Sequence, residues 1–133
     1  MNNRDFQGRT AIVIDKSIVA VPDVWQMFEA FGIEPVDASP EDGYWCYEVK
    51  DESGLTLRLS FNVFENSLQT AMSLGGHAIA TVCQEGAAWL RVEAVGGRKT
   101  LRGACEFQGA IAQVQIAFAP TVSVCWSTLV TDS

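Results

Sequence analysis

The residues of this chain that could take part in chemistry are two pairs of adjacent carboxylates, four cysteines and one histidine. The carboxylate pairs are Glu41–Asp42 and Asp51–Glu52. Paired carboxylates can act as general acid and base or hold a divalent cation. Both pairs stand among turn residues, which favours solvated carboxylates over an acid held in an apolar pocket. The sequence therefore predicts neither a glycosidase nor another enzyme of this type.

A calcium loop is one alternative for the same region. Asp37, Ser39 and Glu41 have the spacing of the first ligands of such a loop. Pro40 and Asp42, however, occupy positions where calcium loops keep flexibility and a glycine. We therefore expect no bound metal.

The cysteines and the histidine give little indication of a metal, redox or catalytic site. The cysteines are at least 20 residues apart, so their spacing favours no metal knuckle or redox pair, and we expect buried, reduced side chains: Cys46, Cys83, Cys105 and Cys125. His77 follows Gly75–Gly76 directly and is expected in a turn or at a strand edge, and no G-x-S-x-G motif is present. We predict no catalytic residue and no cofactor.

Charge gives the clearest functional signal. Residues 34–52 contain seven acids and one base, so they carry six of the chain's seven net negative charges. Such a local field, with aromatic residues inside it, suits the capture of a basic protein. The same field would repel nucleic acid.

The strand predicted at residues 44–50 places an aromatic side chain in this field. Alternation directs Trp45, Tyr47 and Val49 to the core and leaves Tyr44 and Glu48 outward. An outward tyrosine ringed by acids combines an amphipathic anchor with complementary charge. The sequence predicts these partner-binding residues: Glu41, Asp42, Tyr44, Glu48, Asp51 and Glu52. The alternative is that these acids form no binding surface and are simply charged turn residues exposed to solvent, which would give the same sequence pattern.

From Leu55 onward the side-chain period is two, and turn signals return every 8 to 12 residues. Strands are expected at 55–63, 68–74, 78–84, 88–95, 101–107, 110–119 and 122–126, joined by tight turns such as Gly75–Gly76. Pro120 should lie at a strand boundary, an edge or a bulge.

The N-terminal third predicts a short strand at 10–14 and a helix at 22–31, in which Val24, Met27, Phe28 and Phe31 form an apolar stripe. Residues 38–43 have the composition of a loop. The fold class is α+β and β-rich: an antiparallel meander of about seven or eight strands with one N-terminal helix packed on the sheet. A single curved sheet and a two-layer sandwich both remain open.

The 133 residues fit one domain, residues 1–133. The start of the chain lacks the apolar core of a secretory signal, and no apolar run approaches the roughly 20 residues of a spanning helix. We expect a cytoplasmic protein with no membrane partner.

Size, acidity and β-rich character, with the strand-like segments 55–61 and 120–126, resemble the immunity proteins of bacterial polymorphic toxin systems. This resemblance implies a protein that neutralises a cognate toxin, often a basic nuclease, by covering it. It implies no residue-level assignment, because immunity proteins differ widely in sequence and fold.

Two other functions remain open. A structural or accessory subunit of a phage or secretion assembly would self-associate through exposed strands, with 110–126 as the expected edge. A small-ligand-binding β protein would hold an apolar pocket inside a curved sheet, with Trp89 or Trp126 in its wall.

Overall fold

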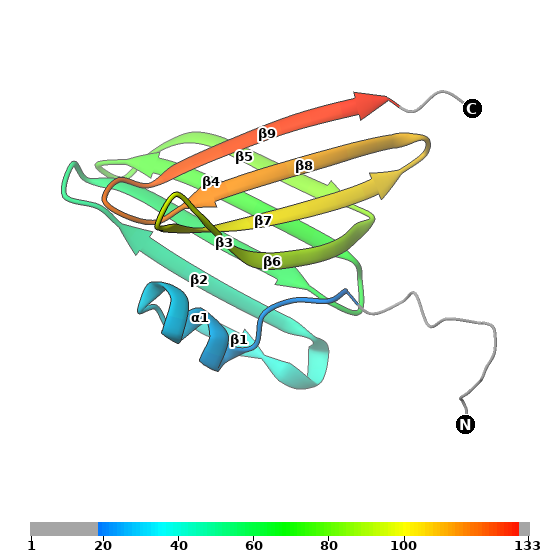
Figure 1. Ribbon diagram of the computed structural model, residues 1–133, viewed down its shortest axis with the longest axis horizontal. Coiled ribbons are helices and arrows are strands. Elements are labelled where there is room, and N and C mark those ends of the chain that lie inside the picture. Colours follow the sequence, from blue (N-terminus) through cyan, green and yellow to red (C-terminus); the bar gives the residue numbers. More distant parts are fainter. Residues whose placement is uncertain (1–18, 131–133) are drawn as a thin grey trace.

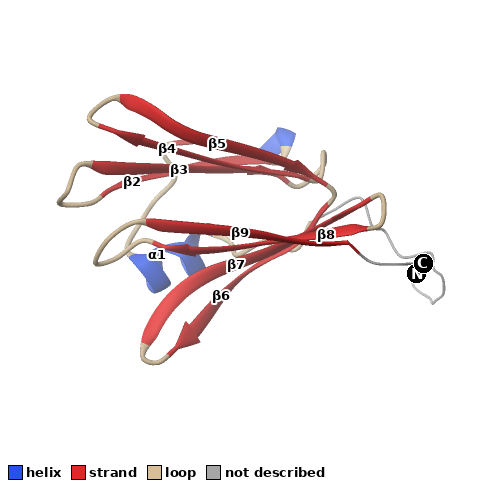
Figure 2. Ribbon diagram, turned by 90° about the horizontal axis from the view of Figure 1, so that it is seen from above, coloured by secondary structure: helices blue, strands red, loops and turns tan. Residues whose placement is uncertain are grey.

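The computed structural model describes residues 19–130 as a sandwich of two antiparallel sheets with a helix at one side (Figures 1 and 2). The first sheet has the order β1-β2-β3-β4-β5 and the second β6-β7-β8-β9. The elements are α1 (Val24–Phe31), β1 (Asp37–Ser39), the 3-10 helix η1 (Pro40–Asp42), β2 (Tyr44–Lys50), β3 (Leu55–Asn62), β4 (Ser67–Leu74), β5 (His77–Glu85), β6 (Ala87–Val95), β7 (Arg98–Phe107), β8 (Ala110–Ala117) and β9 (Ser123–Val130).

The predicted fold class is confirmed, and the architecture is the two-layer form. The described part contains nine strands, because the unpredicted strand β1 forms where the expected loop 38–43 begins and pairs with β2. Pro120 lies between β8 and β9, as expected for a residue that cannot donate to a ladder. The strand predicted at 10–14 lies outside the described residues.

The chain changes sheets at Gly86, where the sequence predicted an ordinary turn within one meander. β5 ends the first sheet and β6 begins the second. Gly86 has φ of 78°, and a Cβ atom there would lie 2.2 Å from the carbonyl oxygen of Glu106. Only glycine allows this approach of two backbones. A local turn signal cannot show that the next strand joins another sheet.

The core lies between the two sheets and follows the predicted alternation. In β3, Leu57 and Leu59 are completely buried and Phe61 nearly so, while the intervening residues face outward. The second sheet contributes further buried side chains, Leu101, Val114 and Ile116 among them. The inward residues of both sheets thus fill one interior, which fixes which face of each strand is left for partners.

Helix α1 closes one side of the sandwich, beside β1 and β2 of one sheet and β6 of the other (Figures 1 and 2). Asp23 forms a capping box with Gln26, and Gly32 ends the helix in the left-handed conformation. Met27 is fully buried and Phe31 packs on Phe118 with ring centroids 4.8 Å apart. The predicted apolar stripe is only half used, because Val24 and Phe28 remain 40% and 45% exposed.

Candidate functional site

Strand β2 presents Tyr44 and Glu48 on the outer face of the five-stranded sheet. Tyr47 is 1% exposed and Trp45 packs against the core, so the predicted alternation is present. Register pairs Tyr44 with Asn62 and Glu48 with Arg58. The outer face is therefore where a partner could reach this strand.

Tyr44 lies over Cys46 and is partly shielded from water. Its pKa is raised above the usual value, chiefly by burial and then by a hydrogen bond with the Cys46 side chain, with Asp37 adding a smaller contribution. The phenol is thus neutral at physiological pH and keeps its proton for hydrogen bonding. Because Cys46 is fully buried beneath it, the ring rests on a packed base.

A hollow of about 260 Å³ lies beside Tyr44 on the same face, and we call it the Tyr44 groove. Its lining combines apolar surface with hydroxyl, amide and carboxylate groups from β2, β3, β4, β5 and the β3–β4 turn: Tyr44, Ser60, Asn62, Glu65, Ser67, Gln69, Cys83, Gln84 and Glu85, with Phe61 and Leu68 beneath. Cys83 donates to Oε1 of Gln69 at 3.0 Å, so the groove walls are joined across two strands. A groove with many acceptors and two carboxylates suits a lysine or arginine side chain.

Glu41 and Asp42 are the last two residues of η1, directly before Gly43 and therefore at the Tyr44 end of β2. The Asp42 carboxylate accepts a hydrogen bond from the Ser39 hydroxyl at 2.6 Å. Gly43 has φ of 73°, and a Cβ atom there would lie 2.6 Å from the Phe64 ring. Packing of Phe64 on Gly43 joins η1 to the turn between β3 and β4, which carries Glu65.

Glu48 is engaged by the only base opposite it in the β2–β3 pairing. Arg58 Nη1 lies 2.9 Å from Glu48 Oε1, and the side chains are 47% and 43% exposed. The pKa of Arg58 is raised, first by Cys46 and then by its hydrogen bond to Glu48. An exposed pair of this kind contributes roughly 0.2–1 kcal/mol. Glu48 therefore offers a partner less free charge than its sequence position suggests.

Asp51 is bound to its own backbone at the opposite end of β2. Oδ1 accepts from the amide and hydroxyl of Ser53 and from the Leu55 amide, and Oδ2 accepts from the Val122 amide at 2.9 Å. The hydrogen bond from the Ser53 side chain, followed by that from the Val122 amide, lowers the pKa of Asp51. This carboxylate links the β2–β3 turn to the segment between β8 and β9 in the other sheet.

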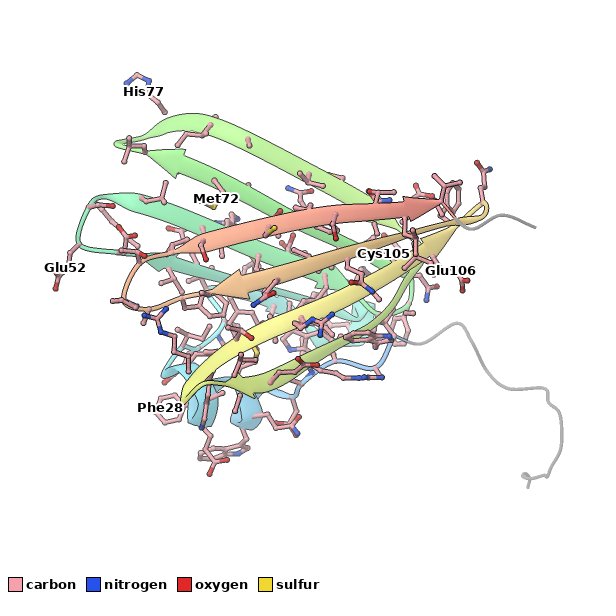
Figure 3. The ribbon with its side chains drawn as sticks, turned by 45° about the horizontal axis from the view of Figure 1, so that its top comes forward. Phe28, Glu52, Met72, His77, Cys105 and Glu106 are labelled. Carbon is pink, nitrogen blue, oxygen red and sulfur yellow. The ribbon has the colours of Figure 1, made fainter. Side chains whose placement is uncertain are left out.

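The structure thus divides the six predicted residues along one strand. Glu41, Asp42 and Tyr44 lie together at the groove end, and Glu48 lies midway. Asp51 and Glu52 lie at the far turn, about 24 Å from Tyr44 at the usual rise of a strand. Figure 3 shows Glu52 at one tip of the molecule and Glu106 at the other. Their role in binding a partner remains a prediction.

Sequence reasoning missed Glu65 and Glu85 in the groove. Both stand outside residues 34–52, in turns that were read only as strand ends. Pairing of Ser67 with Glu85 brings them beside Tyr44. The alternation of β3, β4 and β5 predicted the outward face, but the order of the strands was needed to place these acids together.

The remaining candidates occupy varied positions. All four cysteines are free, but only Cys46 and Cys105 are buried, whereas Cys83 and Cys125 are exposed, contrary to expectation. Both exposed residues lie on outward positions of β5 and β9, where strand-like neighbours did not reveal the facing. Burial raises the pKa of Cys105 to about 11. His77 is exposed where β5 begins (Figure 3). Within residues 19–130 no cluster of three potential metal ligands occurs.

The tryptophans considered for an internal pocket lie elsewhere. Trp126 donates from Nε1 to Thr70 Oγ1 at 2.9 Å, which links β9 of one sheet to β4 of the other. Trp89 lies under the Arg91 guanidinium, whose carbon is 3.9 Å from the ring centroid. At Gly103, between them in the sheet, a Cβ atom would lie 2.8 Å from Leu90. This part of the interior is filled by side chains.

One solved structure has a similar fold. It is a chain of the contact-dependent growth inhibition toxin–immunity protein complex from Klebsiella pneumoniae 342, with a TM-score of 0.77 and 20% sequence identity over 84% of this chain and 98% of that chain. At this identity the similarity is one of fold. No protein-family model matches the sequence, and no curated protein matches it significantly. No helix in the described residues has the length and hydrophobicity to span a bilayer.

Proposed function

We propose that this chain is a cytoplasmic immunity protein that binds and neutralises a cognate, basic toxin domain and has no catalytic activity of its own. The observation that carries the proposal is the Tyr44 groove, a hollow beside Tyr44 with the carboxylates of Glu65 and Glu85 in its wall, while Glu41 and Asp42 precede Tyr44 by two or three residues in η1. The fold shared with a chain of a toxin–immunity complex supports it.

The mechanism we propose is steric and electrostatic. The acidic end of the five-stranded sheet attracts the basic toxin and raises the association rate. A lysine or arginine side chain of the toxin then enters the groove, where carboxylate and amide oxygens replace its water. Tyr44 stacks on its aliphatic stem or guanidinium and slows release. The covered toxin can no longer reach its substrate.

The test is co-expression with a candidate toxin, namely a basic C-terminal domain of a large protein encoded by a neighbouring gene. We expect the intact chain to restore growth and to purify with the toxin as a one-to-one complex. The variant Tyr44→Ser with Glu65→Gln and Glu85→Gln should lose rescue while keeping its melting temperature. Rescue by this variant equal to that of the intact chain would place the binding surface elsewhere, and failure of the intact chain to bind the toxin would overturn the function.

A second candidate, a self-assembling accessory subunit, is favoured by one observation. β9 is an edge strand of its sheet, contains no charged residue, and exposes Leu129 and Val130. Such an edge can pair with another strand. Under this function Leu129→Lys should abolish concentration-dependent assembly, as measured by sedimentation velocity.

A further inference from the structure

The side of the molecule closed by α1 carries an exposed apolar patch. Trp25 is 73% exposed and contacts Phe28 edge-to-face, with ring centroids 6.3 Å apart. These two rings and Val24 line a hollow of about 340 Å³, whose fourth wall is Glu34. Figure 3 shows Phe28 projecting from the edge of the molecule. An exposed tryptophan beside a second aromatic is the composition of a protein-binding hot spot.

One flank of this patch is acidic. Glu34 lines the hollow itself, and Asp37 follows in β1, the edge strand of the five-stranded sheet. Neither side chain has an ion-pair partner among residues 19–130. Val36, between them, is 56% exposed and extends the apolar surface along the same edge.

The other flank is basic. A second hollow, of about 410 Å³, separates α1 from the second sheet, and Arg91 and Lys99 line its far wall opposite Gln26 and Glu29. Of the bases of the β6–β7 hairpin, Arg91 and Lys99 line this hollow, against the single acid Glu29, so the flank has a net positive charge. Arg102 lies elsewhere, in a hollow lined by residues of β8 and β9. Glu93 is paired with Arg102 at 3.4 Å, and the Arg91 guanidinium lies over the Trp89 ring. Lys99 has no ion-pair partner among residues 19–130 and is the base most available to a second molecule.

The order across this side is therefore acidic, apolar, basic. A surface of this order is complementary to itself when a second copy is turned by a two-fold rotation, because each acidic flank then meets a basic flank and the apolar centres coincide. A basic toxin would find a repulsive flank here, and an acidic partner likewise. A second copy is the occupant whose charges match both flanks.

We propose that the α1 side is the interface of a symmetric homodimer, with Trp25 and Phe28 at the two-fold axis and Glu34 of each protomer facing Lys99 of the other. The Tyr44 groove, on the outer face of the five-stranded sheet, stays open in this dimer. The inference is independent of the identity of any other partner.

The first experiment measures mass by sedimentation equilibrium of the purified chain over a range of concentrations. We expect a monomer–dimer equilibrium that Trp25→Ser weakens about 30-fold, the effect of a hot-spot residue. Ile79→Ser is the control, since Ile79 is also an exposed apolar residue, at 57%, on the distant β5 edge. A chain that remains monomeric, or a dimer that Trp25→Ser leaves unchanged, would overturn the proposal.

The second experiment uses the symmetry of the interface. The variant Glu34→Lys and the variant Lys99→Glu each have like charges at both 34–99 contacts of their homodimer. Each substitution should therefore weaken the dimer. When the two variants are mixed, a heterodimer can form in which both contacts between positions 34 and 99 join opposite charges. One contact is the native Glu34–Lys99 pair, and the other is the same pair with its charges exchanged. Native mass spectrometry should therefore show the heterodimer in excess of either homodimer. A statistical mixture of the three dimers would overturn the pairing and with it the two-fold arrangement.

The third experiment measures toxin binding by the Trp25→Ser variant. If Trp25→Ser abolishes toxin binding and the free chain is monomeric, the patch belongs to the toxin interface and the homodimer is excluded. If Trp25→Ser dissociates the dimer while toxin binding persists, the two surfaces are separate, as proposed. Circular dichroism melting of each variant verifies that the fold is intact.

Discussion

The two ends of β2 carry the same kinds of residue and use them differently. At one end, both carboxylate oxygens of Asp51 accept hydrogen bonds, from Ser53, Leu55 and Val122. At the other end, Glu41 has no hydrogen-bond or ion-pair partner within residues 19–130. Asp42 accepts one hydrogen bond, from the Ser39 hydroxyl. The first end stabilises the fold, and the second is available to a partner.

The difference shows that charge alone does not identify a binding surface. A carboxylate with its lone pairs occupied by backbone amides would have to give up those bonds to meet a cation. One that faces water gives up only solvent. The acids most useful for binding are therefore those at the groove end, two of which, Glu65 and Glu85, stand outside the acidic segment in the sequence.

The largest expected effect is on the rate of toxin association. Combined replacement of the four groove-end acids (Glu41→Gln, Asp42→Asn, Glu65→Gln, Glu85→Gln) should lower the association rate constant by about 100-fold at low salt, because the steering field is lost. Stopped-flow fluorescence at several salt concentrations measures this, and the salt dependence should flatten as well. An unchanged rate constant would remove the distinction between the two ends.

Removal of the aromatic anchor should act on dissociation instead. Tyr44→Ser should weaken toxin affinity about 30-fold, mainly through faster release. Tyr44→Phe keeps the ring and loses the hydroxyl, so it separates stacking from hydrogen bonding. Surface plasmon resonance gives both rate constants. Equal effects of the two variants on release would show that the hydroxyl, and not the ring, holds the partner.

Local features of the fold were predictable from the sequence because they depend on short-range chemistry. The bounds of β2 and the end of α1 at Gly32 follow from alternation and from the conformational freedom of glycine. The passage of the chain from the first sheet to the second at Gly86 was not predictable. The alternation of inward and outward side chains along a strand is the same whichever sheet the strand joins. Gly86 is the point at which the chain passes from one layer to the other.

The candidate site was predictable in part for the same reason. Tyr44 and its outward direction follow from the strand period. The acids that join it in space, and the hydrogen bonds that occupy Asp51, depend on contacts between residues far apart, such as the 71 positions from Asp51 to Val122. The basic flank beside α1 was also missed, because the later part of the chain has equal numbers of acids and bases.

A smaller effect concerns stability at the other end of β2. Asp51→Asn should lower the melting temperature by about 5 °C, because an amide cannot accept all the hydrogen bonds that the carboxylate accepts. Glu52→Gln is the matched control, being the next residue with the same change of charge, and should shift the midpoint by less than about 1 °C. Scanning calorimetry at pH 7 measures both. Equal shifts would mean that charge, and not hydrogen bonding, accounts for the role of Asp51.

The smallest effect is the pH dependence of that difference. Because its folded pKa is lowered, Asp51 contributes stability that is fully present above the pKa of the unfolded chain, near 3.8, and is lost as pH falls through the folded pKa. The difference in melting temperature between the intact chain and Asp51→Asn should therefore be constant from pH 7 to about pH 5 and shrink below about pH 4. Subtraction cancels the other carboxylates, which titrate in both proteins. A difference that stays constant down to pH 2.5 would show that the charge of the Asp51 carboxylate contributes nothing to stability, so that hydrogen-bond geometry alone would distinguish the two ends of β2.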